Sequence, residues 1–160
     1  MTSPSRKSAG ATAAAIAATL VAACATPADP SAPRTDTPAA AVGKVWEWRG
    51  TASRAGTLEP TVQRTYSLRL QDDGVAHILA DCTFVRTRYE ISAGRIRFEP
   101  VSVSRKGCMA PSLGDQFLAD VTRATAFFAQ GGQLYLDLPN NAGTMRFVPA
   151  PFWPPYQWTW

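Results

Sequence analysis

Histidine, and the motifs that depend on it, are scarce in this chain. His77 is the only histidine among 160 residues, and no Cys-x-x-Cys pair accompanies it, which argues against a zinc site. A Ser-His-Asp triad would require His77 to meet Ser67 or Ser92 and a carboxylate. The sequence also has no Walker loop, no dinucleotide-binding fingerprint and no zinc-protease signature. These absences predict that the protein is not an enzyme and holds no metal and no cofactor.

The few residues that could carry chemistry have simpler structural explanations. Asp72 and Asp73 precede Gly74, an order that is typical of a tight turn rather than of paired catalytic carboxylates. His77 falls on the polar side of an alternating strand pattern, so we expect it to be an exposed strand residue.

Long apolar runs and strong net charge are also lacking. The apolar run at residues 11–23 is far shorter than the ~20 residues that a membrane-spanning helix needs. It follows Arg6 and Lys7 and ends in small residues, which is typical of a secretory signal peptide. Removal of residues 1–23 takes two of the 16 basic residues and leaves 14 against 12 acidic ones, a net charge of +2. Nucleic acid is therefore a poor candidate for a partner.

The end of the apolar run carries a more specific signal. Residues 20–24 are Leu-Val-Ala-Ala-Cys, which resembles the bacterial lipobox, where small residues fit the signal peptidase and the cysteine thiol takes the lipid. The alternative is an ordinary alanine-rich signal peptide with an incidental cysteine. We predict a lipoprotein signal peptide at residues 1–23 and acylation, including palmitate, at Cys24.

The segment that follows Cys24 differs in composition from the rest of the chain. Residues 24–42 are rich in Ala, Pro and Thr and contain almost no large apolar side chain. Such a segment buries too little surface to offset its ordering entropy, so we expect an extended, mobile linker. Ala25, by resemblance to enterobacterial lipoproteins, favours sorting to the outer membrane. We expect a lipid-anchored protein facing the periplasm, with the inner membrane as the alternative.

Two cysteines remain in the folded part. Cys82 and Cys108 are an even pair in an exported domain, which predicts a disulfide. It would close a loop of about 26 residues and contribute roughly 3 kcal/mol in the chain-entropy model. The alternatives are two buried thiols or half of a metal site.

Most of the remaining sequence predicts β-strands. Apolar and polar residues alternate through residues 45–49, 66–70, 87–91 and 95–98. We expect one strand over about 75–85, with Ala76, Ile78, Ala80, Cys82 and Phe84 on a single inward face. Three short strands, at residues 126–130, 133–138 and 144–148, are separated by Gly131-Gly132 and by residues 140–143.

The period of the apolar residues changes after Cys108. Leu113, Phe117, Leu118, Val121 and Ala124 share one helical face, and Ser112 with Asp115 gives a modest capping-box signal. We predict an α+β fold, in which a curled antiparallel sheet of about eight strands, a partial barrel, surrounds one helix.

These features, in this order, resemble a known family. From about Val45 to Phe147 the chain resembles the META domain of the HslJ-like heat-inducible lipoproteins. The family usually has Gly-Cys-Asn at the first cysteine and a glutamate at the start of the helix, and this chain differs at both. The resemblance implies a small envelope protein linked to stress or antibiotic tolerance, brings no agreed enzymatic activity with it, and assigns residues 43–149 to the domain. The matching residues are Trp46, Gly74, Asp81-Cys82-Thr83, Lys106-Gly107-Cys108-Met109, Asp115, Phe117, Leu118, Leu134-Tyr135-Leu136 and Met145-Arg146-Phe147.

Outward strand positions hold several arginines. If their strands are neighbours, they form a cationic face that suits lipid phosphates. The alternative is a solubilising sheet surface, since Glu90 and Glu99 lie among them. The arginines are Arg69, Arg86, Arg88, Arg95 and Arg97.

The segment at residues 150–160 lies beyond the family resemblance and is rich in aromatic residues and proline. Its candidate contact residues are Trp153, Tyr156, Trp158 and Trp160. The segment either covers the domain's own core or offers an aromatic patch to a partner or to the membrane interface.

Taken together, the sequence predicts a monomeric, non-enzymatic envelope lipoprotein that binds an envelope protein or lipid and maintains the outer membrane under stress. The alternative is a periplasmic carrier of lipids or other hydrophobic ligands, with a small cavity inside the curled sheet.

Overall fold

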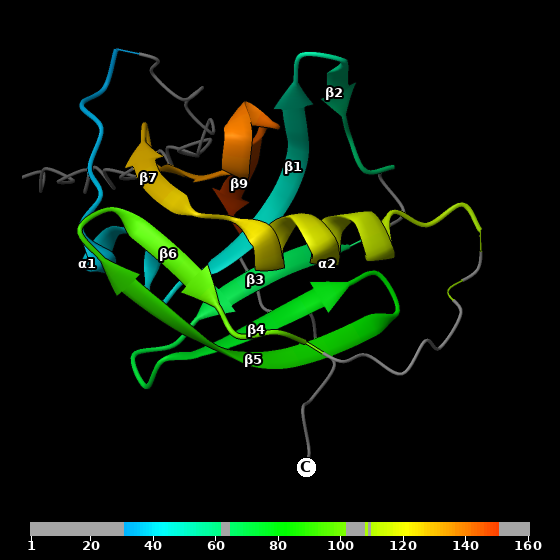
Figure 1. The fold of residues 1–160 in the computed structure, drawn as a ribbon, viewed down its shortest axis with the longest axis horizontal. Coiled ribbons are helices and arrows are strands. Elements are labelled where there is room, and N and C mark those ends of the chain that lie inside the picture. The colour runs from blue at the N-terminus through cyan, green and yellow to red at the C-terminus, as the bar shows by residue number, and fades with distance from the viewer. Residues whose placement is uncertain (1–30, 62–64, 102–107, 109, 151–160) are drawn as a thin grey trace, which may run out of the picture.

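The computed structural model describes residues 31–61, 65–101, 108 and 110–150. Its strands form one antiparallel sheet in the order β2-β1-β3-β4-β5-β6-β7-β8-β9, and β1 also pairs with β9, which closes the sheet into a barrel (Figure 1). The predicted curled sheet with one main helix is confirmed, and the sheet closes completely. The strands are β1 (Val45–Ser53), β2 (Gly56–Leu58), β3 (Tyr66–Leu70), β4 (Val75–Ala80), β5 (Thr83–Ser92), β6 (Arg95–Phe98), β7 (Ala126–Gln130), β8 (Gln133–Asp137) and β9 (Thr144–Pro149).

Within the described residues, three helical segments accompany the barrel. They are α1 (Pro38–Ala41), α2 (Gly114–Arg123) and the short 3-10 helix η1 (Pro139–Asn141). The amphipathic helix predicted over residues 113–124 corresponds to α2, and Phe117, Leu118, Val121 and Ala124 are buried as expected. The capping-box prediction is wrong: the helix is capped at Leu113 without a side-chain hydrogen bond, and Ser112 Oγ instead accepts a hydrogen bond from the Gly114 N–H at 3.2 Å.

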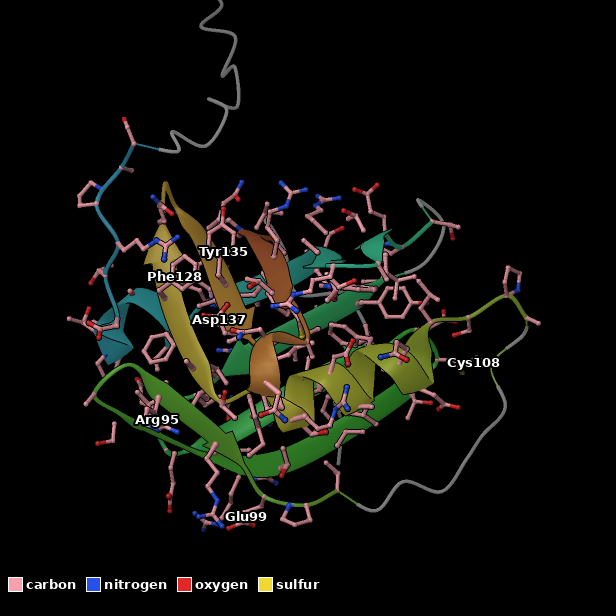
Figure 2. All side chains as sticks on the ribbon, turned by 45° about the horizontal axis from the view of Figure 1, so that its top comes forward. Arg95, Glu99, Cys108, Phe128, Tyr135 and Asp137 are labelled. Carbon is pink, nitrogen blue, oxygen red and sulfur yellow. A yellow bond between two sulfur atoms is a disulfide. The ribbon has the colours of Figure 1, made fainter. Side chains whose placement is uncertain are left out.

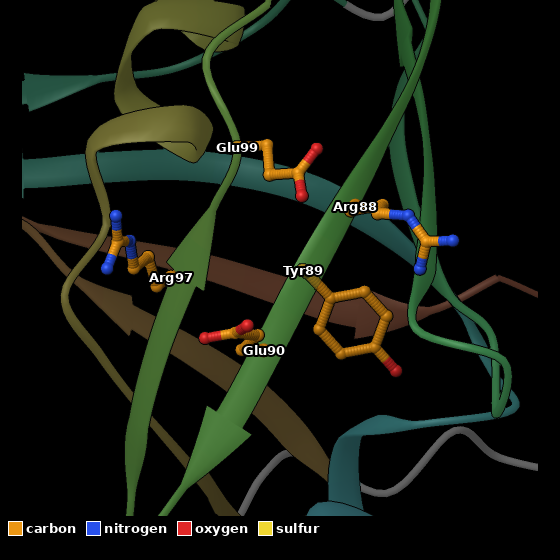
Figure 3. A pocket seen from close by; sticks show the side chains of 5 residues that line it. All are labelled: Arg88, Tyr89, Glu90, Arg97 and Glu99. Carbon is orange, nitrogen blue, oxygen red and sulfur yellow. The ribbon is translucent and has the colours of Figure 1, made fainter.

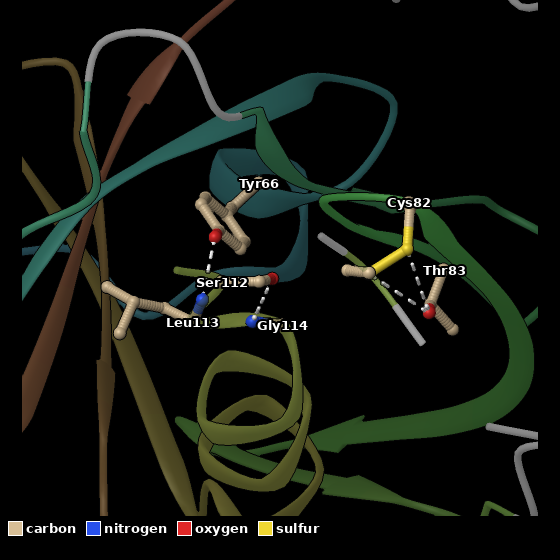
Figure 4. Close-up of a disulfide and its surroundings, with 7 residues drawn as sticks. Tyr66, Cys82, Thr83, Ser112, Leu113 and Gly114 are labelled. Carbon is tan, nitrogen blue, oxygen red and sulfur yellow. Dashed lines mark hydrogen bonds between the residues drawn. A yellow bond between two sulfur atoms is a disulfide. The ribbon is translucent and has the colours of Figure 1, made fainter. Parts of the chain in front are cut away.

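The barrel interior is filled by aromatic side chains. Trp48, Tyr66 and Phe117 meet with ring centres 5.2–5.4 Å apart, and each is at most 1% exposed. The Tyr66 hydroxyl also accepts a hydrogen bond from the Leu113 N–H at 2.9 Å (Figure 4). The start of α2 is therefore attached to β3 from within the barrel.

The single strand predicted over residues 75–85 is wrong, because the chain turns at Asp81-Cys82. Asp81 has φ of +59°, a left-handed conformation that Asp tolerates better than most residues, and Ala80 then pairs with Thr83 across the turn. The inward-facing positions at the start of β5 are consequently shifted by one residue relative to the prediction. Val85 is buried there, whereas Cys82 lies exposed in the turn and Phe84 faces outward.

Cys82 and Cys108 form the predicted disulfide, with their Cα atoms 5.6 Å apart. Thr83 Oγ1 lies 3.9 Å from Cys108 Sγ (Figure 4). The bond joins the β4–β5 turn to the segment that precedes α2, at the end of the barrel where the helix begins.

The later part of the predicted mobile linker is packed against the barrel. Ala41 is fully buried, and its carbonyl accepts a hydrogen bond from Trp46 Nε1 at 2.7 Å. The composition of residues 24–42 did not indicate this, because small side chains can be buried one at a time without forming an apolar stripe.

Candidate functional site

The five outward arginines lie on three strands of the consecutive set β3-β4-β5-β6. Arg69 is on β3, Arg86 and Arg88 are on β5, and Arg95 and Arg97 are on β6. Four of these side chains are exposed, and Arg69 is half-buried. Arg69 pairs with His77 on β4, and His77 pairs with Arg86, so these three residues form one row across three strands.

Carboxylates interrupt the arginines beyond this row. Glu90 pairs with Arg97 across β5 and β6, and the Glu99 N–H donates to the Arg88 carbonyl at 3.0 Å. Together with Tyr89, these four residues line one surface hollow (Figure 3). The β5–β6 part of the face is thus mixed in charge, and the cationic part consists of Arg69 and Arg86, which flank His77 in one row.

His77 stands at the centre of that row, with Phe84 edge-on at 5.5 Å between ring centres. Partial burial lowers the pKa of His77 below 6.5; Arg86 and then Arg69 add to this effect, and Asp73 opposes it. Asp73 Oδ1 accepts a hydrogen bond from the Val75 N–H at 3.0 Å, which confirms its role in the turn.

The structure does not assemble a catalytic triad or a metal site from the described residues. Ser67 Oγ is buried and has no hydrogen-bond partner in the described part of the chain, His77 included. Within residues 31–61, 65–101, 108 and 110–150, no three metal-ligating side chains gather.

A second outward feature was missed by the sequence analysis. Phe128 and Tyr135 stack with ring centres 4.7 Å apart and planes 7° apart, and the Arg34 guanidinium lies 4.4 Å from the Phe128 ring centre. Figure 2 shows the two rings side by side on the outer face of β7 and β8. The alternation of Phe127 inward and Phe128 outward on β7 was the signal that could have identified this pair.

The outer face of β3 and β4 contains two unexpectedly buried residues. Ser67 and Leu79 pair with each other and point away from the core, yet they are 1% and 5% exposed. The helix α2 contacts β4, but it packs on the core side of the sheet and therefore does not account for the burial of Ser67 and Leu79 on the outer face. The described chain ends close by, because the Ala150 N–H donates to the Val45 carbonyl at 2.9 Å and Val45 pairs with Arg69.

Several predicted residues lie outside the described part of the chain. They are Cys24 and the aromatic residues Trp153, Tyr156, Trp158 and Trp160. No helix in the part that is described is long and apolar enough to cross a membrane.

The pKa of His77 predicts a pH effect on stability. The pKa is lowered in the folded state, so the unfolded chain binds this proton more readily below pH 6.5. The contribution of neutral His77 to the free energy of unfolding is fully present above pH 6.5. It is lost as the pH falls through the lowered pKa of the folded state. Urea unfolding at pH 7.5 and 5.5 should show a larger loss for the wild type than for His77→Gln. NMR titration of this single histidine checks the cause, and a folded-state pKa at or above 6.5 contradicts it.

The burial of Leu79 motivates a truncation experiment. We expect deletion of residues 152–160 to lower the melting temperature by about 5 °C or more, since exposing a leucine costs about 1.5–3 kcal/mol. Calorimetry measures the change, and the same deletion in a Leu79→Ala background should cost less. Unchanged stability would instead leave this aromatic segment available for a partner or a membrane.

The comparisons with known proteins agree with the fold. The model of the META domain family matches residues 41–151, and the comparison with curated proteins finds no match. An NMR structure of a protein from Burkholderia xenovorans is similar, with a TM-score of 0.61 and 22% sequence identity, over 79% of this chain and 100% of that one. At this identity the likeness supports the fold alone. The family match spans most of the folded chain, and the protein therefore belongs to the META domain family.

Proposed function

We propose that the protein is a non-enzymatic lipoprotein of the bacterial cell envelope, which binds a partner on its outer surface and supports the outer membrane under stress. The observation that carries the proposal is the filled barrel. Trp46, Trp48, Tyr66, Phe117 and Phe147 are each at most 1% exposed inside it. Binding is therefore expected on the outside of the barrel. Arg86 and Arg88 are exposed there, and Phe128 and Tyr135 are half-buried.

A carrier of lipids or other hydrophobic ligands is the alternative, and it would need an apolar cavity. Three hollows bordered by described residues are open to solvent and have charged residues in their walls, such as Arg88, Glu99 and Asp72. This arrangement favours partner binding over the carrier function. The interrupted arginine face likewise makes anionic lipid phosphate a weaker candidate than a protein partner.

The envelope location is supported by the sequence, and the stress role by the family resemblance. A lipobox-like Leu-Val-Ala-Ala-Cys at residues 20–24 supports an acylation site at Cys24, eight residues before Ala32. The disulfide between Cys82 and Cys108 is consistent with an oxidising compartment. We propose that Cys24 carries the lipid and that the domain faces the periplasm from the outer membrane.

Acylation is tested by Cys24→Ala in cells fed a labelled fatty acid. The wild type should incorporate the label and sediment with outer membranes, whereas Cys24→Ala should do neither, because the lipid-bearing thiol is gone. The double variant Cys82→Ser/Cys108→Ser is the matched control and should remain labelled. Labelling of Cys24→Ala, or an unlabelled wild type, would refute the lipoprotein assignment.

Native mass spectrometry separates partner binding from ligand carriage. Residues 25–160, exported behind a cleavable signal and purified gently, should appear as an empty monomer whose mass is two protons below that of the reduced chain. An added lipid mass retained through purification would favour the carrier function instead. With an empty monomer, in-cell crosslinking from Tyr135 is the next step toward identifying the partner.

A further inference from the structure

The chain between the predicted lipid anchor and the barrel is bound to the barrel surface. The Thr35 N–H donates to the Ala129 carbonyl at 2.9 Å, and the Ala129 N–H donates back to Thr35 at 2.7 Å. This edge of β7 is open to the incoming segment because β6 pairs with β7 only at Arg95 and Ala126. The segment thus pairs where the barrel strands diverge.

Side chains hold the same segment in place. Gln130 Nε2 donates to the Ala32 carbonyl at 2.9 Å, and Arg34 packs over the Phe128 ring at 4.4 Å. Asp36 lies so close to the β5–β6 turn that a Cβ atom at Gly94 would sit 2.6 Å from Asp36 Oδ2. With α1 and the buried Ala41 following, residues 32–42 form what we call the docked tether.

The docked tether begins at one end of the barrel. Ala32 contacts Gln130, next to the β7–β8 turn at residues 131–132. The same end contains the start of β1 and Ala150, which are hydrogen-bonded to each other. We call this the tether end. The opposite end, the disulfide end, contains η1 and the bond between Cys82 and Cys108, and Figure 2 shows Cys108 far from Phe128.

Docking shortens the reach of the lipid anchor. Seven residues separate Cys24 from Ala32, and their fully extended length is about 25 Å. If the chain were free up to Gly43, the reach would be about 60 Å. A globular domain of this size is roughly 35 Å across, so a tether of about 25 Å that starts at one end cannot hold the barrel upright with its opposite end on the bilayer.

We propose that the docked tether orients the barrel on the membrane, so that the tether end faces the lipid surface and the disulfide end faces the periplasm. This inference rests on the proposed acylation of Cys24. The occupant of the tether end is the bilayer to which the anchor belongs. The turns at the disulfide end and the outer face of β5 and β6, where Arg86, Arg88 and Arg97 are exposed, remain accessible to a protein that approaches from the periplasm.

Energy transfer from the two ends of the barrel tests the orientation. The acylated full-length mature protein is inserted into phosphatidylcholine vesicles that carry a headgroup acceptor dye. A donor is attached through an azido amino acid that replaces either Lys44, at the tether end, or Ala142, beside η1. Both positions are exposed. Transfer should be at least twofold more efficient from position 44 than from position 142.

A variant with a released tether provides the control. Thr35→Pro with Arg34→Ala removes the N–H that bonds Ala129 and the contact with Phe128, so the longer free tether should reduce the difference between the two donor positions. Thr35→Ser keeps the N–H and should behave as the wild type. Equal transfer from both positions in the wild type, or stronger transfer from position 142, overturns the proposal.

Failure of the orientation can be separated from failure of the lipoprotein assignment. Intact mass of the same sample reports whether Cys24 is acylated. If it is not, the assignment fails, and coupling Cys24 to a maleimide lipid then supplies an anchor at the same residue. The comparison of positions 44 and 142 on that anchor still decides whether the docked tether orients the barrel.

Discussion

The barrel depends on β1, the strand that pairs with three others. Its first half pairs with β3, its second half with β2, and its other edge runs along β9. A register shift between Trp48 and Gly50 bends the strand so that both edges can be used. Gly50 is required there, because a Cβ atom would lie 2.8 Å from the Leu58 carbonyl. Closure through β1 encloses the aromatic cluster, and the cluster in turn holds α2.

Closure also determines where function can reside. Because Trp48, Tyr66 and Phe117 fill the interior, the charged and aromatic side chains that could bind a partner lie on the outer strand faces and at the two ends of the barrel. Those ends differ: the chain enters and leaves the described barrel at the tether end, whereas the disulfide between Cys82 and Cys108 crosslinks the opposite end. This difference between the ends fits the proposed arrangement, in which one end stays near the lipid anchor and the other is presented to a partner.

Several elements were predictable because local pattern and final environment agree. Tyr66, Leu68 and Leu70 alternate with polar residues and are buried in β3 as expected, and the helical spacing of Phe117, Leu118 and Val121 identified α2. The turn at Asp81-Cys82 was missed because the apolar alternation continues through it. A two-residue turn reverses the chain, and only the pairing of Ala80 with Thr83 reveals that Phe84 faces outward.

The sequence by itself determined the local elements. The strand and helix periods, the cysteine pair and the polar turns are encoded over short stretches of chain. Tertiary structure decided what depends on distant residues meeting. It closed β1 onto β9, stacked Phe128 on Tyr135, aligned Arg69, His77 and Arg86 in one row, and docked residues 32–42 on β7. The physical reason is that such contacts are set by strand register and by free sheet edges, which no local pattern specifies.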